Sequence, residues 1–269
     1  MNKYIFLALV NLYVLAFNHT YYPLEFISDV ELQITNEPLK TSIHSLLTRR
    51  HTKVPGSHDL FGCSNKGKCY SHKKLNYRDA RTALFGQLHL ERDKGGEYFV
   101  HDVYCDIDYY SSSKVGRIGP NKIPNHTVIN CEHTWPQSKF NHYSRYQKSD
   151  LHHLFPTNSR ANSIRDSHDF GEIKSDRGLS RECTSSQYEN RNFEPPKKHK
   201  GNVARAMFYF AVRYKMTISR RVESTLRKWH ESDPVDSKEL KRNDAIYEIQ
   251  GNRNPFIDYP ELVSRISNF

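Results

Sequence analysis

Two short segments gather the side chains best suited to acid–base or metal chemistry. They are NCEHTWPQS at 130–138 and SDLHHLFPTNSRANSIRD at 149–166. Hydrolysis of a phosphodiester bond needs a cation to neutralise charge on the phosphate and a base to take a proton from water. Glu132 can bind such a cation, and His133 is suited to be the base because free histidine has a pKa of about 6.5. The adjacent pair therefore supplies the two residue types that metal-assisted hydrolysis needs.

The adjacency of Glu132 and His133 sets a geometric condition. Neighbouring residues of a regular strand point to opposite faces, so the two side chains reach one site only at a strand end or a bulge. Trp135-Pro136 follows two residues later and predicts such an ending. On spacing alone, a Glu-His pair would usually be two surface residues.

The second segment is expected to be a short strand followed by a helix. Asp150 to Pro156 is interpreted as a strand that stops at its proline, and at least one of His152 and His153 is expected to be structural. The expected helix that follows Pro156 contains two asparagines that could bind a metal ion.

Thr157 is expected to cap a helix that contains Asn158, Asn162 and Arg165. These three positions are spaced by four and three residues and so share one helical face. An amide oxygen is an acceptable ligand for Mg²⁺ or Ca²⁺, and an arginine beside it can hold a phosphate with two hydrogen bonds. Taken alone, these residues would be ordinary capping and surface residues.

The rest of the chain predicts the elements that position these segments. Apolar spacing indicates helices over residues 36–47 and 76–90, and alternation indicates a strand over 98–104. Residues 203–218 are apolar nearly all round, which is typical of a buried helix. No repeat or long linker divides the chain, so we expect a single α+β domain, mostly helical around a smaller β element.

Residues 1–18 are expected to be a signal peptide, with residues 19–269 forming the mature protein. Lys3 precedes an apolar run from Tyr4 to Phe17 that is interrupted only by Asn11 and is too short to span a membrane alone. The alternative is an amphiphilic N-terminal helix. The signal peptide predicts a secreted or periplasmic protein that is not held in the membrane after cleavage.

Five cysteines fit an oxidising compartment. Cys63 and Cys69 bracket the loop GCSNKGKC and are expected to form a small disulfide ring. Cys105 and Cys131 both end apolar runs and are expected to pair, which would leave Cys183 over. A zinc site is the rival interpretation, although the chain has no Cys-x-x-Cys pair.

The formal net charge of +10 favours a polyanionic partner such as nucleic acid, a sulfated glycan or an anionic membrane. The loop PPKKHKG at 195–201 offers Lys197, Lys198 and Lys200 as phosphate contacts, or is simply a solvated basic loop. Charge alone does not choose among these partners.

The order of a segment with Glu-His, a segment with Asp-Leu-His-His-Leu-Phe-Pro and a helix with Asn resembles the ββα-metal (His-Me) finger. It is most similar to the endonuclease I family of secreted and periplasmic bacterial nucleases. The resemblance extends to NYRDAR, GNVARAMFYF and RNDAIYEIQGNRNPFIDYP, and covers residues 35 to 260.

The resemblance implies a nuclease domain built around the finger, with a small antiparallel sheet. His133 would be the general base, Glu132 and Asn162 the ligands of one divalent ion, and Asn158 a second choice to Asn162. Arg145 or Arg165 would stabilise the transition state.

The ion would be Mg²⁺, with Mn²⁺ or Ca²⁺ possible. A monomer would cut DNA, and possibly RNA, through contacts to backbone phosphates with little sequence preference, leaving 5′-phosphate and 3′-hydroxyl ends.

Two other functions stay open at this stage. A zinc hydrolase would use Glu132, His133, His152 and His153, although the chain lacks an H-E-x-x-H motif and Asn162 would then have no role. A basic protein that binds polyanions without catalysis would account for the charge but not for the placement of Glu132, His133 and Asn162.

Overall fold

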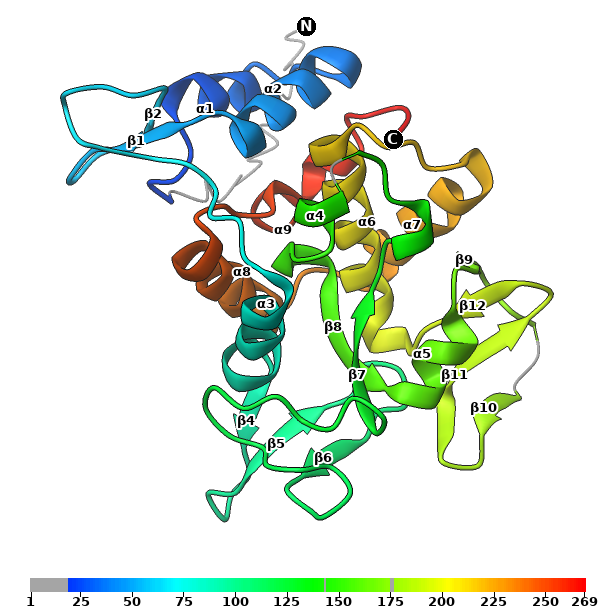
Figure 1. Ribbon diagram of the computed structural model, residues 1–269. Helices are drawn as coiled ribbons and strands as arrows, with labels where there is room; N and C mark the ends of the chain where they lie inside the picture. Colours follow the sequence, from blue (N-terminus) through cyan, green and yellow to red (C-terminus); the bar gives the residue numbers. More distant parts are fainter. Residues whose placement is uncertain (1–18, 143, 175–176) are drawn as a thin grey trace, which may run out of the picture.

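A computed structural model describes residues 19–142, 144–174 and 177–269 (Figure 1). The expected signal peptide at 1–18 lies outside these residues. Helices and small sheets are mixed along the described chain, which confirms the α+β class. The α-helices are α1 (Leu24–Glu31), α2 (Asn36–Thr48), α3 (Tyr77–Ala83), α4 (Ser144–Gln147), α5 (Ser159–Arg165), α6 (Lys200–Tyr214), α7 (Arg220–Ser232), α8 (Ser237–Gln250) and α9 (Pro255–Asp258).

Helix α6 runs through the middle of the molecule, with α2, α7 and α9 packed against it (Figure 1). All its residues from Val203 to Tyr214 are buried, which confirms the buried helix expected from its apolar surface. It ends earlier than expected, because Lys215 adopts a left-handed conformation that terminates the helix. The predicted helix over 36–47 is also confirmed as α2.

Four small sheets surround this helical centre. Their neighbouring strands are antiparallel except for the pair β12–β9. The strand expected over 98–104 ends at His101, because the chain turns at Asp102. The strands are β1 (His51–Lys53), β2 (Leu60–Phe61), β3 (Lys68–Tyr70), β4 (Leu90–Arg92), β5 (Tyr98–His101), β6 (Asp108–Tyr110), β7 (Ile129–His133), β8 (Leu154–Asn158), β9 (Asp169–Phe170), β10 (Gly178–Ser180), β11 (Cys183–Glu189) and β12 (Asn192–Glu194).

Strands β7 and β8 pair antiparallel and are followed by α5, which confirms the expected β-β-α order. The expected strand at 150–156 was misplaced: Leu151–His153 form a 3₁₀ turn, and β8 begins at Leu154 and continues through Pro156. Pro156 is tolerated because its backbone faces away from β7, where its carbonyl accepts a hydrogen bond from the Val103 amide.

The cap of α5 also differs from expectation. Asn158, not Thr157, is the capping residue, and its side-chain oxygen accepts from the amides of Arg160 and Ala161. Thr157 is still part of β8, and its hydroxyl donates to Asp102. Because β8 extends beyond its proline, the helix starts later than the sequence pattern indicated.

The expected Cys63–Cys69 disulfide is present, but the second predicted pairing is wrong. Cys105 pairs with Cys183, and Cys131 is a buried free thiol. The backbone carbonyl next to Cys105, that of Tyr104, accepts from Ser186, so this segment lies against β11. Cys131 belongs to a different hydrophobic cluster, packed with α3 and Leu154, and cannot reach Cys105.

We predict that the Cys105–Cys183 bond stabilises the fold more than the Cys63–Cys69 bond does. It joins residues separated by 78 positions rather than 6, and a longer closed loop removes more entropy from the unfolded chain. Replacing both cysteines by serine should lower the unfolding free energy by about 4 kcal/mol for the first pair and about 2 kcal/mol for the second. Urea titration of the two double variants measures this. A peptide map in which Cys131 is disulfide-linked would contradict the assignment.

Candidate active site

Glu132 and His133 leave β7 on opposite faces, as a regular strand requires. Glu132 contacts Tyr104 and Arg165, whereas the His133 ring packs against Tyr77 with ring centres 5.7 Å apart. The strand ends at His133, which agrees with the strand end expected before Pro136. A common reaction site for both side chains must therefore lie where the two faces meet, at an edge of β7.

Glu132 is a buried carboxylate with two protein partners on one of its oxygens. The Tyr104 hydroxyl donates to Oε1 at 2.9 Å, and Arg165 Nε lies 3.1 Å from the same atom. Burial raises the pKa of Glu132, while Arg165 and the Tyr104 hydrogen bond act in the opposite direction. The His133 backbone amide also lowers the pKa of this carboxylate, but no described side chain forms a hydrogen bond with Oε2.

Arg165 is only 1% exposed, and its guanidinium contacts several protein groups. Its guanidinium donates to the carbonyls of Thr134 and Asp166, each at 2.8 Å, and lies 4.4 Å from the centre of the Phe170 ring. The expected phosphate-binding arginine on α5 is thus turned inward, toward Glu132. The structure places Arg165 as a partner of that carboxylate.

Asn162 lies beside the same stretch of β7. Its amide nitrogen is 3.4 Å from the Cys131 carbonyl, a long hydrogen bond that turns Nδ2 toward the strand. The Cys131 carbonyl is free for this contact because Cys131 and Pro156 form a pair whose backbone groups point away from each other, so the carbonyl lies on the edge of β7 that β8 does not cover. Asn162 Oδ1 has no partner among the described residues.

Asn158, the alternative to Asn162, has another role. Its oxygen caps α5, and its amide nitrogen donates to the Tyr109 hydroxyl at 2.7 Å. Both ends of the Asn158 amide are therefore engaged with the protein, whereas Asn162 keeps a free oxygen.

The tautomer of His133 follows from its two contacts. Nε2 lies 3.0 Å from the Lys148 carbonyl, which can only accept, so Nε2 carries the hydrogen. Nδ1 is then the lone-pair nitrogen, and the Gln137 amide donates to it at 3.3 Å. Burial lowers the pKa of His133 to about 3, with the charge of His153 acting the same way. The imidazole is therefore neutral at neutral pH, the form that can accept a proton.

His152 and His153 are both buried, and each ring binds a backbone carbonyl through one nitrogen. His153 donates from Nε2 to the Gln147 carbonyl at 2.6 Å, and His152 donates to the Asn252 carbonyl at 3.1 Å. Within 19–142, 144–174 and 177–269, no group of three or more His, Cys, Asp or Glu side chains converges to hold a metal ion. The four-residue zinc site that includes His152 and His153 is not assembled in the described chain.

The remaining predicted residues lie farther out. Arg145 is exposed on α4, three residues before the Lys148 carbonyl that holds His133. Lys198 forms an ion pair with Asp106, and Lys200 is mostly buried between Glu172 and Glu194. The expected loop at 195–201 is in fact a 3₁₀ turn over Lys197–His199 that leads into α6, and Lys197 is exposed on this turn.

Several contacts of the site were not anticipated from the sequence. Tyr104, which binds Glu132, lies 28 residues away in the chain and gave no local signal. The Lys148 carbonyl is a backbone atom, and residue identity does not mark it. Gln137 lies four residues after His133 in the same motif, and this proximity is the one signal that could have found it.

Comparison with known proteins agrees with this geometry. Residues 64–261 match the family described as Endonuclease I. An extracellular ribonuclease of Bacillus amyloliquefaciens is 33% identical over 72% of this chain and 69% of its own length. Endonuclease-1 of Buchnera aphidicola subsp. Acyrthosiphon pisum is 26% identical, over 74% of this chain and 87% of its own. An extracellular deoxyribonuclease of Aeromonas hydrophila is 29% identical, over 41% and 49%.

The likeness covers the β7–β8–α5 unit and most of the helices around it. Among the described residues, no helix is long and apolar enough to cross a membrane. The chain belongs to the endonuclease I family and is an exported nuclease.

Proposed function

We propose that the chain hydrolyses phosphodiester bonds of DNA, and of RNA, with one divalent cation held by Glu132 and Asn162. The observation that carries this proposal is a pair of oxygens without a side-chain partner among the described residues, Glu132 Oε2 and Asn162 Oδ1, beside the same stretch of β7. A neutral histidine whose Nδ1 lone pair accepts only the long hydrogen bond from Gln137 follows directly in the strand.

The two oxygens suit a hard cation such as Mg²⁺. A carboxylate and an amide oxygen are ligands that Mg²⁺ accepts, and the ion usually keeps several waters besides one or two protein ligands. Mn²⁺ and Ca²⁺ accept the same oxygen ligands. Burial raises the pKa of Glu132, and a cation beside it would favour the charged carboxylate. When bound, the ion would stabilise negative charge on the phosphate and on the leaving oxygen.

His133 supplies the base. Its Nδ1 accepts a proton from water, and the oxygen of that water forms a bond to phosphorus. The P–O3′ bond breaks and the leaving O3′ takes a proton from solvent water, which leaves a 5′-phosphate and a 3′-hydroxyl. The Lys148 carbonyl stabilises the imidazolium that forms, because it accepts the hydrogen on Nε2 throughout. Gln137 must release Nδ1 before water can bind there, since it donates to the same atom.

The reacting phosphate would lie at the edge of β7 that β8 does not cover. Among the described strands, β7 pairs with β8 alone. On the other edge of β7, the Cys131 carbonyl accepts a hydrogen bond from the Asn162 amide. From this edge a phosphate could contact the oxygens on the Glu132 side and the His133 ring on the other side. At this edge, Glu132 and His133 could act on the same phosphate although their side chains point to opposite faces of β7.

The substrate is proposed to be nucleic acid without strong sequence preference. Relatives named as ribonucleases and as deoxyribonucleases both match, and the net charge of +10 suits contact with backbone phosphates. A polyanion-binding protein without catalysis would share the charge but would not need the free oxygens beside β7. Cleavage therefore decides between the two.

Metal dependence tests the proposal directly. In a plasmid-nicking assay, chelator should stop cleavage and added Mg²⁺ should restore it. Glu132→Gln and Asn162→Ala should each raise the Mg²⁺ concentration needed for half-maximal cleavage by about tenfold or more, because the first removes the negative charge of a ligand and the second removes an amide oxygen. The control is Asn158→Ala, whose amide is occupied within the protein.

If Asn158→Ala changes the Mg²⁺ requirement more than Asn162→Ala does, the ligand assignment is one helical turn out of register. Full cleavage in chelator would end the metal proposal, and recovery with Zn²⁺ alone would favour a zinc enzyme. No cleavage under any of these conditions would favour a binding protein.

His133→Ala should lower the cleavage rate by about 10²–10⁴-fold while leaving binding of nucleic acid unchanged, because the residue acts in proton transfer. Single-turnover cleavage of a labelled duplex and binding in chelator measure the two effects separately. His126→Ala, an exposed histidine in the loop before β7, is the matched control and should cleave normally. Turnover near wild type in His133→Ala removes the base assignment.

The two arginine candidates should separate by readout. Arg145→Gln should lower the cleavage rate about a hundredfold with little effect on stability, since the side chain is exposed and can donate to a phosphate. Arg165→Gln should lower the unfolding free energy by about 3 kcal/mol or more, because it leaves the buried Glu132 carboxylate without its charge partner. Thermal unfolding and single-turnover rates of both variants decide the roles. A stable Arg165→Gln protein with a large rate defect would reverse them.

A further inference from the structure

Tyr77, at the start of α3, lies between His133 and two cationic side chains. Its ring packs against His133 with ring centres 5.7 Å apart. The Lys148 ammonium is 4.7 Å and the Arg81 guanidinium carbon 5.9 Å from the centre of the same ring. Both cations are thus within cation–π range of one tyrosine beside His133.

Neither of these two cations has an acidic partner in the part of the chain that the structure describes. Among the described residues, neither Arg81 nor Lys148 forms an ion pair, and Arg81 Nε is buried without a hydrogen-bond partner. The 195–201 segment differs, because Lys198 and Lys200 are engaged with carboxylates. A cation whose charge is not neutralised by the protein is the better candidate for a phosphate contact.

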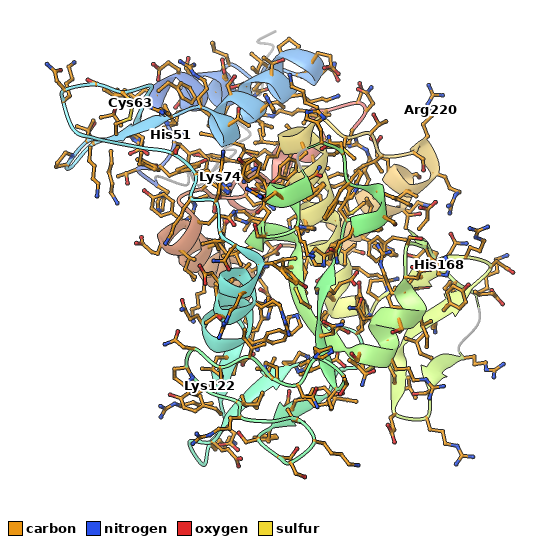
Figure 2. The ribbon with its side chains drawn as sticks, in the orientation of Figure 1. His51, Cys63, Lys74, Lys122, His168 and Arg220 are labelled. Atoms are coloured by element: carbon orange, nitrogen blue, oxygen red, sulfur yellow. A yellow bond between two sulfur atoms is a disulfide. The ribbon has the colours of Figure 1, made fainter. Side chains whose placement is uncertain are left out.

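A second cation–aromatic pair lies nearby in the chain. The Lys74 ammonium is 4.0 Å from the centre of the Tyr146 ring and donates to its hydroxyl at 2.8 Å. Figure 2 shows Lys74 in the segment that leads to α3, next to α4. Exposed Arg145 precedes Tyr146 on α4. Positive charge therefore gathers on the His133 side of the molecule, over α3 and α4.

We infer that Tyr77, Arg81 and Lys148 form a binding site for a backbone phosphate of the substrate strand, next to the phosphate that is cleaved. Tyr77 holds the two cations beside His133, and the cations bind the phosphate oxygens. This inference rests on the proposed nuclease function and deepens it, because it names the surface along which the strand lies. The site would serve binding rather than chemistry.

Binding in chelator tests the site without requiring cleavage. The probe is a fluorescein-labelled 20-base-pair duplex, followed by anisotropy at several salt concentrations. Arg81→Gln and Lys148→Gln should each weaken binding about five- to tenfold and reduce the slope of log affinity against log salt by about 0.9, the value for one lost phosphate contact. Arg78→Gln removes the same charge from an exposed position of α3 and should change affinity less than about twofold, with an unchanged slope.

Equal losses in Arg81→Gln and Arg78→Gln would show that only net charge matters and would overturn the site. So would unchanged slopes in both Arg81→Gln and Lys148→Gln. Lys148 is exposed and its variant keeps the backbone carbonyl that binds His133, so this variant remains informative if Arg81→Gln fails to fold.

The inference and the proposed function fail in different ways. A chain that binds through Arg81 and Lys148 but never cleaves would refute the nuclease mechanism and leave the phosphate site standing. A chain that cleaves with Mg²⁺ while both variants bind as wild type would refute the phosphate site alone.

Discussion

The buried ion pair between Glu132 and Arg165 is the interaction on which the geometry of the site depends. A carboxylate that is 2% exposed is costly unless a charge and hydrogen bonds compensate it, and Arg165 and Tyr104 supply both. Arg165 also binds the carbonyl of Thr134, just beyond the end of β7. The pair therefore ties the last turn of α5 to β7 and fixes where Asn162 meets the strand.

A second buried charge holds the other side of the site. Burial alone would raise the pKa of Asp150, but the Arg213 guanidinium holds it well below its usual range. Asp150 also accepts from the hydroxyls of Tyr209 and Tyr214 on α6. This network anchors the 3₁₀ turn that precedes β8 to the central helix. The turn carries His153, which binds the carbonyl of Gln147, the neighbour of Lys148. The contact that sets the His133 tautomer is thus connected to the core.

The positive charge that remains available to a substrate depends on which Lys and Arg side chains form ion pairs with carboxylates of the protein. The Lys-rich segment at 195–201 is conspicuous in the sequence, yet Asp106 and Glu172, which are distant in the chain, form ion pairs with two of its lysines. Arg81 and Lys148 are isolated in the sequence, yet the fold brings both to one tyrosine. A cluster of basic residues in the sequence therefore indicates net charge only. Which of these residues can bind a phosphate depends on whether residues distant in the chain form ion pairs with them.

The sequence by itself determined the α+β class, the β-β-α order, the buried helix α6 and the Cys63–Cys69 ring, because each depends on local pattern or short separation. Only the tertiary structure decided the Cys105–Cys183 pairing, the inward turn of Arg165 and the strand that continues through Pro156. Each of these is set by a partner at least 33 residues away: Cys183 for Cys105, Glu132 for Arg165 and Val103 for Pro156. Periodicity and residue type describe a segment's own preference, and they carry no information on which distant group will meet it.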